Sequence, residues 1–150
     1  MPQIPPEFQP LNEWSELAER IIEKHSEKFT GIDVKKIRAV VITNKERSES
    51  NDKLFEIKAV PDPIRMDCPY AYYIIFYQED WSILENKNKL LLIAKTLRSI
   101  PLDDNGEMVE GKVNSFDLKD FADMIRTFGP DYLVKETVPD ILQDDFKWID

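Results

Sequence analysis

The sequence predicts an α+β fold in which a small mixed or antiparallel sheet of about three strands packs against helices. Segments rich in β-branched and aromatic residues predict strands at 37–43, 54–60 and 71–77. Apolar residues at helical spacing predict helices at 12–28, 88–101 and 116–128. The strands follow one another instead of alternating with the helices, and this order is typical of an α+β domain.

The N-terminal segment, residues 1–11, is rich in proline, which lacks the amide donor that a helix or an inner strand needs. We therefore expect an extended arm at 1–11, followed by a single domain over 12–150. Asn12 is a suitable cap for the first helix. The apolar face of that helix runs from Trp14 to Phe29, and Gly31 is expected to end it.

The three predicted strands differ in how deeply they should be buried. The segment 37–43 is largely β-branched, and 54–60 alternates, with Phe55 and Ile57 opposite Glu56 and Lys58. The segment 71–77 is apolar on both faces, so we expect it inside the sheet or beneath a helix.

The helix at 88–101 is expected to be the centre of the fold. Its apolar residues recur at i, i+3, i+4 and i+7 as Leu90, Ile93, Ala94 and Leu97. Leu91 and Leu92 widen this stripe, so the helix should be buried on more than one side. Lys95 and Ser99 lie four residues apart on the side facing away from the stripe, and Pro101 should stop the helix.

The C-terminal third begins with a turn at 103–106 and continues into the helix at 116–128, which Gly129 and Pro130 end. Asp117, Asp120 and Asp123 share the face of this helix opposite its apolar one. We expect a solvated face there, although a loosely held divalent cation is an alternative. Phe146 and Trp148 either dock onto a second chain or fold back onto the domain, and the sequence leaves both open.

The chain carries a formal net charge of −9, and most of the excess lies at its C-terminal end. Residues 101–150 hold 13 of the 29 acidic residues but only 5 of the 20 basic ones. Acidic surfaces repel phosphates and anionic lipid, so we expect no direct nucleic-acid or membrane binding. The apolar runs are too short to cross a bilayer. The single cysteine, Cys68, predicts a reducing, cytoplasmic location.

Several features, in order, resemble the phage-type metallopeptidases, small zincin-like domains of phages, prophages and some archaea. These features are the amphipathic helix around 17–24, the strand at 72–76 with Trp81 after it, the helix ending at Ile100 and Pro101, and the segment 116–121 leading to Phe128 and Gly129. The resemblance covers roughly residues 12 to 133. It implies a zincin-like fold and a zinc site built on the motif His-Glu-Leu-x-His followed by Ile-Pro, with a later His-Asp.

The resemblance also implies which positions of this chain correspond to that zinc site. When Ile100 and Pro101 are aligned with the Ile-Pro of the family, its three histidines, its glutamate and its aspartate fall on other residues here. In chain order these are Lys95 (first histidine), Thr96 (glutamate), Ser99 (second histidine), Phe116 (third histidine) and Asp117 (aspartate, retained). A slip of one residue would instead place Ala94, Lys95 and Arg98 in the motif, again without a histidine.

The residue types argue against zinc chemistry independently of the family. A catalytic zinc ion takes about three protein ligands, mainly histidine, and the chain has one histidine, His25, besides Cys68. We expect His25, near the end of the first helix, to be a packing or capping residue. A protonated Lys95 would repel the ion, and Thr96 cannot replace a glutamate as general base. We therefore expect no catalytic residue, no metal and no cofactor.

These observations lead to a hypothesis of a non-catalytic metallopeptidase-like protein, a pseudoenzyme of phage or mobile-element type that binds or regulates another protein. Its cleft would lie between the central helix and the 116–128 helix, lined by Lys95, Ser99 and Asp117, or would have filled in. An alternative is an acidic decoy or inhibitor of a basic protein that handles nucleic acid. A residual hydrolase is the third reading. The partner and the oligomeric state are left open by the sequence.

Overall fold

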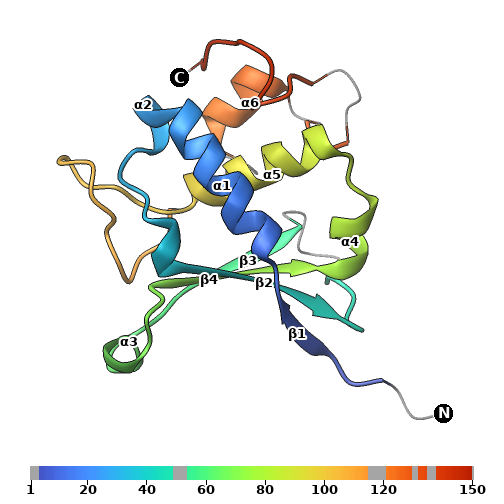
Figure 1. Ribbon diagram of the computed structural model, residues 1–150, viewed down its shortest axis with the longest axis vertical. Coiled ribbons are helices and arrows are strands. Elements are labelled where there is room, and N and C mark those ends of the chain that lie inside the picture. Colours follow the sequence, from blue (N-terminus) through green and yellow to red (C-terminus); the bar gives the residue numbers. More distant parts are fainter. Residues whose placement is uncertain (1–3, 49–53, 115–120, 130–131, 135–137, 150) are drawn as a thin grey trace.

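The computed structural model describes residues 4–48, 54–114, 121–129, 132–134 and 138–149 (Figure 1). In chain order the elements are β1 (Glu7–Pro10), α1 (Asn12–Lys24), α2 (Ser26–Phe29), the 3-10 helix η1 (Val34–Lys36), β2 (Ile37–Thr43), β3 (Phe55–Ala59), α3 (Ile64–Asp67), β4 (Tyr72–Tyr77), α4 (Gln78–Ile83), α5 (Asn86–Arg98) and α6 (Ala122–Phe128). The α+β class predicted from the sequence is confirmed.

The sheet has the strand order β1-β2-β4-β3. β2 and β4 are parallel, whereas β1 and β3 pair antiparallel with their neighbours. Within the described ranges there are thus four strands instead of about three, because residues 7–10 of the predicted arm pair with β2. Pro10 is accommodated there because β1 is an edge strand. β4 lies inside the sheet, as its apolar sequence predicted.

The helices α1, α5 and α6 lie on one side of the sheet, while the small helix α3 lies on the other (Figure 1). The helix-covered face carries Ile37, Ala39, Tyr72, Ile74 and Phe76, which join the main hydrophobic core. The opposite face holds a second, small cluster of Ile42, Ile75 and Tyr77. The strands are therefore apolar on both faces, but only one face carries the main helical layer.

The first predicted helix is divided in two, because α1 ends at Lys24 and α2 begins at Ser26. Asn12 is the first helical residue, and Leu11 occupies the cap position without a side-chain hydrogen bond, so the expected Asn12 cap is wrong. Gly31 follows α2 and has a packing role: a Cβ atom there would lie 1.4 Å from the carbonyl oxygen of Gly106. Only glycine allows the 103–106 turn to approach this closely.

The central helix is buried along most of its length. Every residue of α5 from Leu90 to Leu97 is at most 6% exposed, which confirms burial on more than one side. Trp81 lies on the separate helix α4. α6 ends at Gly129, whose φ of 89° suits glycine, while residues 116–120 of the predicted last helix lie outside the described residues.

Candidate functional site

Thr96, which the resemblance aligns with the family's glutamate, joins α5 to α1. Its hydroxyl oxygen accepts a hydrogen bond of 3.0 Å from the indole Nε1 of Trp14 and donates one of 2.6 Å to the carbonyl oxygen of Ile93. Thr96 and Trp14 are both completely buried. Both hydrogen-bonding functions of the hydroxyl are therefore used inside the core.

Lys95 and Ser99, which the resemblance aligns with the two motif histidines, are also buried, with 4% and 1% of their surface exposed. The Ser99 hydroxyl donates to the carbonyl oxygen of Lys95 over 3.1 Å. The Lys95 ammonium lies 5.8 Å from the centre of the Tyr132 ring, within the range of a cation–π interaction. Both residues are directed into the protein interior, so they do not form the wall of an open cleft.

Two segments cover this side of α5. Tyr132 is held over it by Asn88, whose side-chain amide donates to the Tyr132 carbonyl oxygen over 2.7 Å. At the C-terminal end of the helix, the backbone amide of Asn114 donates to the Ser99 carbonyl and its side chain donates to that of Arg98, both over 2.8 Å. Lys95 and Ser99 thus lie beneath these two segments instead of lining an open cleft.

The structure describes only some of the other positions that the resemblance implies. Phe116 and Asp117 lie outside the described residues. Under the alternative alignment, Ala94 is fully buried and Arg98 forms an ion pair. In either alignment, the described positions carry side chains engaged with the protein itself.

Asp123 is buried between α5 and α2. The expectation of a solvated face is therefore wrong for Asp123, whereas Asp117 and Asp120 lie outside the described residues. Its carboxylate accepts a hydrogen bond of 2.7 Å from Arg98 Nε and forms an ion pair with Lys28. Burial raises the pKa of Asp123, but the hydrogen bonds from Lys28 and Arg98 outweigh it and hold that pKa below its ordinary value. Asp123 therefore contributes a buried ion pair, whose partners lie far away in the chain.

His25 is confirmed as a packing and capping residue. It occupies the C-cap of α1, and its Nε2 lies 2.7 Å from the carbonyl oxygen of Ile141. The Trp148 indole donates to His25 Nδ1 over 3.3 Å. Because Nδ1 accepts the hydrogen bond from the Trp148 indole, Nε2 is the ring nitrogen that donates to the Ile141 carbonyl oxygen.

Phe146 and Trp148 fold back onto the domain, which answers the question that the sequence left open. Their rings pack against His25, with Phe29 and Phe128 completing an aromatic cluster. Lys24 adds a hydrogen bond of 2.8 Å to the carbonyl oxygen of Leu142. The C-terminal segment thus packs against α1, α2 and α6, at the top of Figure 1.

Replacing Trp148 by alanine should lower the free energy of unfolding by about 2 kcal/mol, because the half-buried ring would leave a gap among four aromatic neighbours. Trp148→Phe, which keeps a ring but loses the indole donor, should cost roughly half as much. Urea unfolding followed by circular dichroism measures both. Equal stabilities for the wild type and Trp148→Ala would show that the C-terminal segment does not secure the domain.

A family model described as putative phage metallopeptidase matches residues 7–144. The chain belongs to this family. The match extends beyond the expected 12–133 at both ends and includes the edge strand β1. No curated protein and no solved structure matches the chain significantly.

In this member of the phage metallopeptidase family, the described ranges contain no cluster of three or more histidine, cysteine, aspartate or glutamate residues placed to hold a metal ion. His25 lies in the aromatic cluster, and Cys68 lies next to Tyr73, whose hydroxyl is 4.0 Å from its sulfur. The same ranges include no helix with the length and apolar character needed to cross a membrane.

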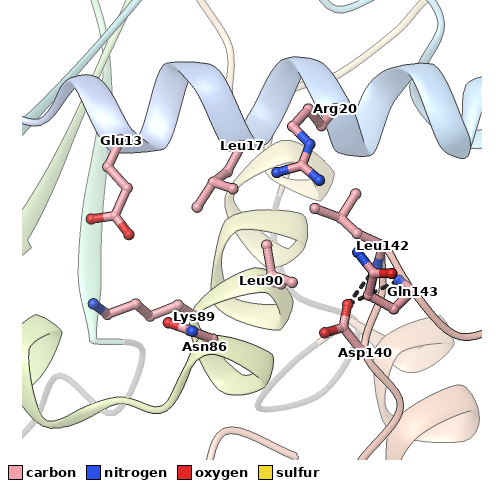
Figure 2. A pocket seen from close by; sticks show the side chains of 9 residues that line it. All are labelled: Glu13, Leu17, Arg20, Asn86, Lys89, Leu90, Asp140, Leu142 and Gln143. Carbon is pink, nitrogen blue, oxygen red and sulfur yellow. Dashed lines mark hydrogen bonds between the residues drawn. The ribbon is translucent and has the colours of Figure 1, made fainter.

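A cavity of about 300 Å³ lies between α1, the start of α5 and the C-terminal segment. Figure 2 shows the side chains that line it. Leu17 and Leu90 lie in its middle, and charged side chains of both signs surround them. The Asp140 carboxylate accepts hydrogen bonds from the backbone amides of Leu142 and Gln143. Lys95, Thr96 and Ser99 do not line this cavity.

Several acidic side chains of residues 101–150 are engaged within the domain. The Asp103 carboxylate accepts hydrogen bonds from two backbone amides of its own turn. The Asp140 carboxylate accepts two such bonds, from Leu142 and Gln143. Glu110 forms ion pairs with Arg65 at 2.7 Å and with Lys36 at 3.6 Å, and the hydrogen bond from Arg65 lowers its pKa. Of these contacts, the ion pairs of Glu110 offset negative charge, whereas the hydrogen bonds of Asp103 and Asp140 fix the carboxylates in place.

Proposed function

We propose that this chain is a non-catalytic member of the phage metallopeptidase family that acts by binding another protein. The observation that carries the proposal is the state of the motif positions on α5. The resemblance aligns Lys95, Thr96 and Ser99 with the two histidines and the glutamate of the family, and all three are buried and bonded within the domain.

The chemistry of these side chains supports the proposal. A protonated lysine offers no electron pair to a zinc ion and repels it by its charge. The Thr96 hydroxyl is engaged with Trp14 and Ile93, and a threonine cannot accept a proton from a zinc-bound water as a glutamate does. The loss therefore affects both halves of the reaction, namely holding the metal and activating water.

A peptidase assay tests the proposal directly. Purified protein incubated with fluorescently labelled, unfolded casein and added zinc should release no more fluorophore than buffer does. The variant Ser99→Ala serves as a matched control and should behave identically. Hydrolysis by the wild type that a chelator abolishes and Ser99→Ala loses would contradict the proposal.

The acidic decoy receives less support, because carboxylates such as those of Glu110 and Asp123 are paired within the domain. The decoy hypothesis predicts that the affinity for a basic partner falls steeply as the salt concentration rises. We infer a cytoplasmic location for the protein, which is supported by its one cysteine being unpaired.

A further inference from the structure

The side of the sheet opposite α5 carries a groove, which we call the outer groove. It lies between β1, the centre of the sheet and the region of α3, and has a volume of about 530 Å³. Its lining residues are mostly apolar: Phe8, Val40, Lys58, Ala59, Val60, Pro61, Ile64, Cys68, Tyr73 and Ile75. Volumes of this size are typical of ligand-binding sites.

Apolar side chains remain exposed at the edge of the groove. Phe8 on β1 and Ile64 on α3, which form opposing parts of its wall, are each 61% exposed, and Met66 on α3 is 82% exposed. Large apolar side chains gathered around one depression are a mark of interaction sites. An acyl chain inside the groove would leave much of this surface in water, whereas a segment of another protein would cover it.

Two basic residues lie at one end of the outer groove. The strand register places Arg38 on β2 and Lys58 on β3 on either side of Tyr73, with all three on the same face. The Lys58 side chain makes no hydrogen bond or ion pair with the part of the chain that the structure describes, whereas its backbone belongs to the β3–β4 pair. The Arg38 guanidinium lies 5.7 Å from the Tyr70 ring. Glu56, two residues before Lys58 on β3 and in register with Ile75, lies on the same face, so this face carries two positive charges and one negative charge.

We propose that the outer groove binds an apolar segment of a partner protein that carries acidic residues next to its apolar ones. The apolar side chains would fill the groove between Phe8 and Ile64, and the carboxylates would lie against Arg38 and Lys58. This local positive charge stands out in a chain of net charge −9, and it favours an acidic partner over a basic one. The inference rests on the proposed function, for which it supplies a binding surface.

A titration of ¹⁵N-labelled protein followed by NMR tests the inference. The probe is the peptide acetyl-Leu-Phe-Leu-Asp-Glu-amide, and the control peptide carries two lysines in place of its acidic residues. We expect the acidic peptide to shift the amide signals of β2, β4 and α3 around the groove, and to bind about tenfold more weakly to Lys58→Glu. Lys87→Glu, an exposed lysine on α5, is the matched control and should bind as the wild type does.

The inference is overturned if the acidic peptide shifts no signal around the outer groove, or if both peptides shift them equally. It is also overturned if the groove signals shift with protein concentration alone, since a second copy of the chain would then be the occupant. Tighter binding of decanoate than of the peptide, at the same signals, would indicate a fatty-acid site instead. None of these results bears on zinc or peptidase activity, so a failure here is distinguishable from a failure of the proposed function.

Discussion

Replacing Thr96 by glutamate, the residue that the resemblance aligns with this position, is expected to destabilise the protein by roughly 4 kcal/mol or more. Thr96 is fully buried against Trp14, so the longer side chain would displace its neighbours and bring an uncompensated carboxylate into the core. Urea unfolding should show a strongly lowered midpoint, or the variant should be unfolded in buffer. The catalytic glutamate thus cannot simply be restored.

Two milder substitutions separate the causes of this effect. Thr96→Val keeps the shape but leaves the Trp14 indole without an acceptor, which should cost about 2 kcal/mol. Thr96→Ser keeps the hydroxyl and loses a methyl group, which should cost about 1 kcal/mol. If Thr96→Glu were as stable as the wild type, the position would have room and access to solvent, contrary to the structure.

Replacing Asp123 by alanine is expected to cost about 3 kcal/mol at neutral pH, because Arg98 and Lys28 would be left facing each other without their shared carboxylate. The side chains of Lys28 and Arg98 are 14% and 27% exposed, so solvent relieves part of their repulsion and the cost falls at the low end for a buried pair. Asp145→Ala removes an exposed carboxylate and should change stability by less than about 0.5 kcal/mol.

The pH dependence of the same variant provides an independent check. Because the pKa of Asp123 in the folded protein lies below 3.8, its stabilisation is complete well above that pH and is lost as the pH falls through the folded value. The difference in unfolding free energy between the wild type and Asp123→Ala should therefore shrink in strongly acidic solution. A difference that stays constant from neutral pH down to pH 2 would mean that ion pairing is not its source.

The sequence predicted those elements whose structure depends on residues that are neighbours in the chain. The β-branched run at 37–43 became β2 with the same bounds, and the widened leucine stripe predicted the nearly complete burial of α5. The position of His25 at the end of α1 likewise followed from its place next to an apolar stripe. In each case, the decisive residues are close together in the sequence.

Pairing between distant residues could not be predicted in the same way. β1 exists because residues 7–10 meet β2 more than thirty residues later, and the proline-rich composition hid this. Asp123 had the spacing of a solvated face, yet Lys28 and Arg98 approach it from two other helices. Tyr132 carries no sequence signal that would place it over Lys95. The packing of Tyr132 against Lys95 was therefore visible only in three dimensions.

Metal content is the most direct test of the central claim, which is that this member of the phage metallopeptidase family lacks a zinc site. Protein purified without chelators would be analysed by inductively coupled plasma mass spectrometry, alongside the variant Lys95→Ala. We predict far less than one zinc ion per chain in both proteins. A tightly held zinc ion in a one-to-one ratio with the wild-type chain would contradict the account.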